Sequence, residues 1–168
     1  MASELTPLVL LHTAISLVAI FTGFVVLFAG FLAGRPLPRW TASFLVTTLL
    51  TSVSGFFLPA THFMPSHGVG ILSITVLTLA LVALYSRHLR GAWRRVYVIT
   101  AVAALYLNVF VLVAQLFSKV PSLKVLAPTQ SEPPFQVTEG LVLLAFVVLG
   151  ALAVARYRPT PAAAGTNP

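Results

Sequence analysis

Five long apolar runs constrain this chain more than any other feature of its sequence. They cover residues 8–33, 40–59, 69–89, 96–117 and 136–155. Each is close to the 20 or so residues with which an α-helix crosses a hydrocarbon core about 30 Å thick. Strands are excluded, since unpaired sheet edges are not tolerated in lipid. The sequence therefore predicts an all-α integral membrane protein, folded as a five-helix transmembrane bundle.

The composition agrees with lipid as the main solvent. Hydrophobic residues make up 58% of the 168 residues and charged residues 8%, whereas a soluble domain carries about 25% charged residues. We expect residues 1–158 to form a single transmembrane domain and residues 159–168, which are rich in proline and alanine, to form a disordered tail. The absence of cysteine excludes disulfides, thiolate catalysis and cysteine-ligated metal centres.

The basic residues predict how the bundle sits in the membrane. The formal net charge is +7, but the charges stand at the ends of apolar runs, so we interpret them as topology signals rather than a nucleic-acid surface. If the five runs alternate in direction, eight of the ten basic residues share one side, in segments 34–39, 86–95 and 156–158. The positive-inside rule then predicts an N-terminus outside and a C-terminus in the cytoplasm, in a bacterial inner membrane.

Residue spacing predicts which face of the first run meets protein. At about 100° per residue, the small residues Ser16, Ala19, Gly23 and Gly30 fall on the face that carries His12. Small residues line helix contacts in membranes because they let two backbones approach closely. We therefore expect His12 to face protein and to bond to a neighbouring helix.

The fourth and fifth runs carry polar residues in register. Asn108, Gln115 and Lys119 are spaced i, i+7 and i+11, close to one line along a helix. A lipid-facing amide near the middle of a membrane would be costly, so we expect this stripe to face the bundle interior. In the fifth run, Glu139 shares a face with Phe146.

Taken together, these positions predict a polar pocket at the outer end of the bundle. The candidate pocket residues are His12, His67, Asn108, Gln115, Lys119 and Glu139, with His62 and Glu132 in the adjoining loops. The hypothesis that this pattern favours is a non-enzymatic accessory or binding protein, surrounded by lipid and joined by a protein partner or a second copy. Nucleic acid is not expected as a partner.

Three other functions use the same residues. Imidazole is a common axial ligand of haem iron, so His12 and His67 are candidates for binding haem b or another redox centre. A metal or small-molecule pocket would use His12, His62, His67 and Glu139. A proton or small-solute transporter would use the polar groups of Asn108, Gln115, Lys119 and Glu139. Enzymes are less favoured, because the chain has no H-E-x-x-H motif, no aspartate and no glycine-rich phosphate loop.

Three segments carry a family resemblance, namely residues 106–110, 115–121 and 127–135. They resemble a group of small uncharacterised bacterial multi-pass inner-membrane proteins. The resemblance covers mainly the fourth run, the long loop and the start of the fifth run. It implies a multi-pass inner-membrane protein and no particular activity.

Overall fold

Helices make up the regular structure of the residues that the structure describes. The computed structural model describes residues 7–58 and 65–158. The helices in these ranges are α1 (Pro7–Val25), η1 (Val26–Phe31), α2 (Pro38–Gly55), α3 (Pro65–Leu81), η2 (Val82–Ser86), α4 (Trp93–Lys119), α5 (Pro121–Leu126) and α6 (Pro133–Arg156). Here η1 and η2 are π-helical continuations of α1 and α3. The predicted tail at 159–168 lies outside the described residues.

Four of the helical segments are long and apolar enough to cross a membrane. They are Pro7–Phe31, His67–Ser86, Trp93–Lys119 and Pro133–Arg156. The prediction of an all-α fold is therefore confirmed, with four helices that are candidate membrane spans. Residues 40–55 of the predicted run 40–59 lie in α2, which has 18 residues and is the most polar of the long helices because hydroxyl residues interrupt its apolar sequence.

Proline marks where the helices begin. It stands in the first turn of α2, α5 and α6, and it is the first residue of α1 and α3. Its fixed φ suits the first turn, where its missing N–H has no helical partner to lose. Gly34 follows η1 with a φ of 68°, in the left-handed region that glycine adopts at little cost.

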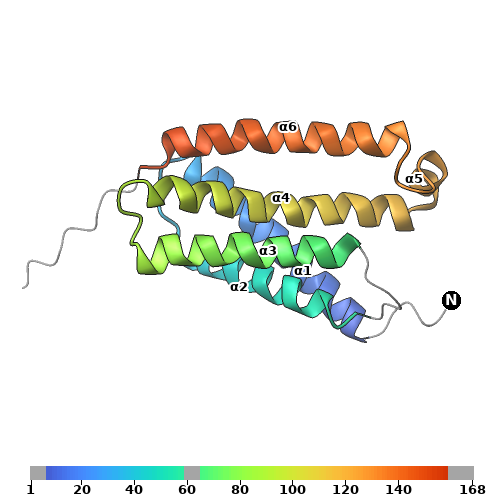
Figure 1. Cartoon of the computed structure of the whole chain (residues 1–168), viewed down its shortest axis with the longest axis horizontal. Helices are drawn as coiled ribbons and strands as arrows, with labels where there is room; N and C mark the ends of the chain where they lie inside the picture. Colours follow the sequence, from blue (N-terminus) through green and yellow to red (C-terminus); the bar gives the residue numbers. More distant parts are fainter. Residues whose placement is uncertain (1–6, 59–64, 159–168) are drawn as a thin grey trace, which may run out of the picture.

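The helix α4 is the centre of the bundle. It has 27 residues, about 40 Å of helix, and it contacts α1, α2, α3, α5 and α6. In Figure 1, α3, α4 and α6 lie side by side along the long axis, while α1 and α2 run obliquely across them. The turn between α1 and α2, the turn between α3 and α4, and the end of α6 lie at one end, the basic end. The opposite end, where α6 begins, is called the acidic end below.

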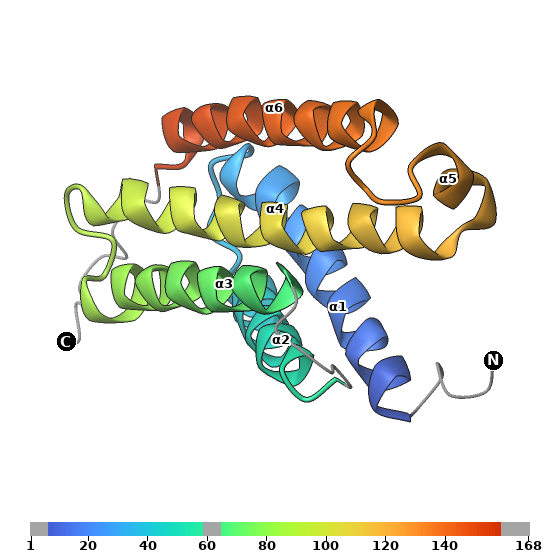
Figure 2. The same ribbon diagram turned by 45° about the vertical axis from the view of Figure 1, so that its right-hand side comes forward.

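A close contact in the core joins α1, α2 and α4 at Gly23. A Cβ atom built there would lie 2.5 Å from Leu105 Cδ1 and 2.8 Å from Phe44 Cε2. Both neighbouring side chains are buried in the main hydrophobic cluster. Only glycine leaves room for them, so the small-residue face predicted for the first run is where α1 packs. Figure 2 shows α1 crossing α4 obliquely.

The segment between the fourth and fifth predicted runs, 118–135, contains a helix. The six residues of α5 begin at Pro121, and Ala127 after them is buried. Phe117 at the end of α4 and Phe135 at the start of α6 pack edge to face, with ring centroids 5.4 Å apart. This segment is therefore partly helical, and its packing comes from Ala127 and from the Phe117–Phe135 pair, since no side chain of α5 itself is buried.

Candidate functional site

The hydroxyl residues of α2 form the polar side of the helix packing. Asn108 of α4 is buried, and its Nδ2 donates a hydrogen bond of 3.1 Å to Thr48 Oγ1. Thr41 and Ser52 are also buried, and the Tyr97 hydroxyl lies within hydrogen-bonding reach of Thr41. The Asn108 amide thus has a hydrogen-bond partner inside the bundle. This arrangement is expected because exposing the amide to lipid would be costly.

A double-mutant cycle tests the bond between Asn108 and Thr48. We expect a coupling energy of about 0.6 kcal/mol for Asn108→Ala with Thr48→Val, the typical strength of an interhelical hydrogen bond in a membrane. Reversible unfolding in mixed micelles measures it. Asn108→Ala with Thr78→Val is the control pair, because the Thr78 hydroxyl donates to Ile74 O of its own helix. Equal coupling in the two pairs would rule the bond out.

His12 packs against the end of α2. Its Nδ1 lies 2.8 Å from Ser54 Oγ, and a Cβ atom at Gly55 would lie 3.6 Å from His12 Cε1. The prediction that His12 faces protein and bonds to a neighbouring helix is thus confirmed. Lys119 at the end of α4 lies within electrostatic range of the ring. The ring is therefore positioned by α2, with a cation from α4 nearby.

His67 also lies beside the end of α2. Its ring stacks on Phe56, with the centroids 5.7 Å apart and the planes inclined by 25°. Both histidines thus meet the last turn of α2, through different residues. The third candidate, His62, lies outside the described residues. Within residues 7–58 and 65–158, no group of three histidine, aspartate or glutamate side chains is arranged to hold a metal ion. Haem binding by His12 and His67 stays a prediction.

Glu139 is the residue with the most unusual environment. It lies on α6, about 9 Å along the helix from Pro133, and only 8% of its surface is exposed. Neither carboxylate oxygen has a hydrogen-bond partner among the residues that the structure describes. The Tyr106 hydroxyl of α4 lies within electrostatic range. A buried carboxyl group without a partner is costly if it is ionised, which sets Glu139 apart from the other candidates.

The surroundings of Glu139 are otherwise aromatic and apolar. Phe146, two turns further along α6, packs against Tyr106 with ring centroids 5.7 Å apart and against Phe24 of α1 at 6.2 Å. Gly150 faces Val102 of α4. The predicted common face of Glu139 and Phe146 is therefore the face on which α6 packs against α4.

The expected polar stripe of α4 faces the interior only in part. Asn108 is buried, but Gln115 and Lys119 are exposed, so that expectation is wrong for the last third of the helix. The reason is length, since α4 extends beyond the ends of α2 and α3 (Figure 1). Moreover, Asn108 faces α2 and Tyr106 faces α6, about 160° apart around the helix. The polar groups of a translocation path along Asn108 and Glu139 would therefore lie on opposite faces of α4.

Glu132 has a structural role in the turn before α6. Its carboxylate accepts hydrogen bonds from the Thr129 hydroxyl at 2.9 Å and from the N–H groups of Thr129 and Ser131 at 3.1 Å. Although desolvation acts to raise it, these bonds hold the pKa of Glu132 below its usual value. Gln130 Nε2 donates to Ala114 O at 2.6 Å, which fastens the turn to α4. Glu132 is therefore satisfied locally and is not part of the environment of Glu139.

Two residues matter here although the spacing argument did not select them. The packing of α6 on α4 brings the Tyr106 hydroxyl within electrostatic range of Glu139, and its polar hydroxyl within an apolar run was the available signal. Arg94 donates to the carbonyl oxygens of Val154, at 3.0 Å, and of Tyr157. Its position in a basic turn gave no sign of this contact.

Comparisons with known proteins identify no relative of this chain. No protein-family model, no curated protein and no solved structure matches the chain.

Proposed function

We propose that this chain is a non-enzymatic accessory or binding protein of a bacterial inner membrane, and that the ligand at its candidate site is a proton carried by Glu139. The fold supports a membrane location through four candidate spans. The observation that carries the proton site is the burial of Glu139 with both carboxylate oxygens unpartnered in the described part of the chain.

The surroundings of Glu139 favour a proton over a larger ligand. A metal ion needs several oxygen or nitrogen ligands, and no three-residue acidic or histidine cluster is present within the described residues. From α4, the Tyr106 hydroxyl lies within electrostatic range of Glu139 without bonding to it. The neutral carboxyl avoids most of the cost of burying a charge. Loss of the proton would then favour water entry between α4 and α6 and weaken the contact between them.

An infrared experiment tests this proposal directly. The chain has three acidic side chains, Glu4, Glu132 and Glu139, so its carboxyl bands can be assigned one variant at a time. We expect protein in liposomes at neutral pH to show the carbonyl stretch of a protonated carboxylic acid, and Glu139→Gln to lose it. Glu132→Gln is the control and should keep the band, because hydrogen bonds hold Glu132 ionised. A wild-type spectrum without the band would contradict the proposal.

We further propose five spans, with α2 crossing the membrane, the N-terminus outside and the C-terminus in the cytoplasm. The uneven distribution of basic residues supports this orientation, and the close packing of α2 along α1 and α3 supports a crossing. Reporters fused to each end test both points. Five spans place the two reporters on opposite sides of the membrane, with the C-terminal one active in the cytoplasm. Two reporters on the same side would contradict a fifth span.

A further inference from the structure

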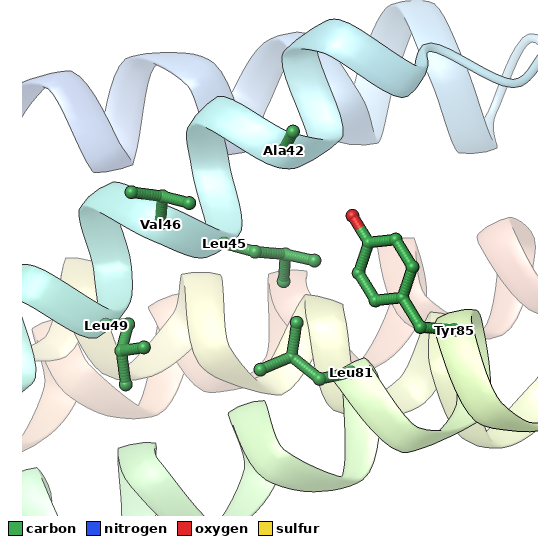
Figure 3. Close-up of a pocket in the computed structure, with 6 residues that line it drawn as sticks. All are labelled: Ala42, Leu45, Val46, Leu49, Leu81 and Tyr85. Atoms are coloured by element: carbon green, nitrogen blue, oxygen red, sulfur yellow. The ribbon is translucent and has the colours of Figure 1, made fainter.

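An open apolar groove lies between α2 and α3 near the basic end of the bundle. It has a volume of about 160 Å³ and is lined by Ala42, Leu45, Val46, Leu49, Leu81 and Tyr85. In Figure 3, Leu45 and Leu81 point toward each other across the groove. The Tyr85 side chain extends from η2 toward α2, and its hydroxyl group is the part directed at α2. Tyr85 and Val46 are exposed at its edges. The groove therefore opens toward the solvent that surrounds the helices, which is lipid along α3.

The groove ends among positive charges. Arg39 precedes Ala42 by three residues and is exposed, so it lies on the same face of α2, one turn closer to the helix start. Arg87 follows Tyr85 by two residues and lies 5.0 Å above the Trp93 ring. The two described acidic residues, Glu132 and Glu139, belong to the far end of the bundle (Figure 1). An apolar groove that ends at cations, with no described acidic residue nearby, is complementary to an amphiphile with an apolar chain and an anionic head group.

We propose that this groove binds one acyl chain of an anionic phospholipid, with the lipid phosphate at Arg39. The size of the groove argues for a stretch of one acyl chain, because a helix with its side chains is about 10 Å across and does not fit in about 160 Å³. Packing against the groove gives the chain van der Waals contacts, and the phosphate gains charge-assisted hydrogen bonds from a guanidinium group. The exposed Trp40 beside Arg39 belongs at the depth of lipid headgroups. The inference holds in either orientation and does not depend on Glu139.

Native mass spectrometry with two competing lipids tests the site. The protein is presented with equal amounts of phosphatidylglycerol and phosphatidylcholine that carry identical acyl chains. We expect one phosphatidylglycerol to be retained in preference. Arg39→Gln should lower that preference about fivefold, the effect of one cation near an anionic lipid. Ala42→Phe should fill the groove and abolish retention of this lipid.

Matched controls separate the groove from general effects of charge and size. Arg158→Gln removes an exposed cation that follows α6, and Ala145→Phe enlarges an exposed residue on α6. Both should behave like the wild type. Because Arg39 is exposed, Arg39→Gln tests the site even if Ala42→Phe fails to fold. Equal retention of both lipids by the wild type, or an unchanged preference in Arg39→Gln, would overturn the proposal. So would loss of a dimer rather than of a lipid in Ala42→Phe, which would assign the groove to a second copy.

Discussion

Gly23→Val is expected to destabilise the bundle by about 1–3 kcal/mol, the usual cost of adding atoms to a packed core. The first added atom would already lie 2.5 Å from Leu105 Cδ1 and 2.8 Å from Phe44 Cε2. These two side chains are almost fully buried, so they have little space in which to move away. The branched Cβ of valine adds two further methyl groups to the same place. Unfolding by denaturing detergent in mixed micelles, followed by circular dichroism, measures the loss.

Gly140→Val is the matched control for this experiment. Gly140 lies within α6, and no heavy atom comes within 4 Å of a Cβ atom built there. The same chemical change therefore alters helix propensity without a clash. We expect Gly140→Val to stay close to the wild type in stability. If the two variants were equally stable, the close crossing of α1, α2 and α4 at Gly23 would be wrong.

The helix faces were predictable from sequence because they depend on angle alone. Spacing placed His12 and Gly23 on the packed face of the first run, and both face protein. It placed Asn108 in the interior, where it bonds to Thr48. Angular spacing identifies the face of a helix that packs, and it does not identify the helix against which that face packs. Ser54 as the partner of His12 follows from how α1 crosses α2.

The exposure of residues near helix ends was not predictable in the same way. Gln115 lies close to the line through Asn108, yet it is exposed because α4 continues past its neighbours. The exposure of such a residue depends on the lengths and tilts of the other helices, and angular spacing gives no information on either. For the same reason, residues that belong to one end of the bundle do not have to line one polar pocket. His12 packs on α2, whereas Glu139 packs on the far side of α4.

The isolation of Glu139 is a property of the fold and not of its residue type. In sequence, Glu139 and Glu132 are two similar acids near the start of one helix. The turn before α6 gives Glu132 its hydrogen-bond donors, while α4 presents apolar side chains and Tyr106 toward Glu139. Seven residues of separation thus produce opposite environments. The proposed proton site follows from this contrast.

Arg94→Gln is expected to release the end of α6 and to cost about 2 kcal/mol, the scale of a hydrogen bond from a charged donor. Arg94 NH1 donates to Val154 O at 3.0 Å and to Tyr157 O. The last carbonyl groups of a helix have no partner within it, so the guanidinium of α4 satisfies them and holds α6 in place. The contact also positions Tyr157, whose ring packs on Phe31 with centroids 4.9 Å apart.

Amide hydrogen exchange at the end of α6 measures this effect locally. The Tyr157 N–H donates to Ala153 O at 2.8 Å, and we expect its protection to fall most in Arg94→Gln. Arg95→Gln is the matched control, because Arg95 is exposed and its loss removes the same charge from the same turn. Equal protection in both variants would show that Arg94 contributes charge alone. A selective loss in Arg94→Gln would establish that α6, the helix that carries Glu139, is fastened to α4 at the end opposite its buried carboxyl group. Water entry at Glu139 would then separate the helices from the acidic end first.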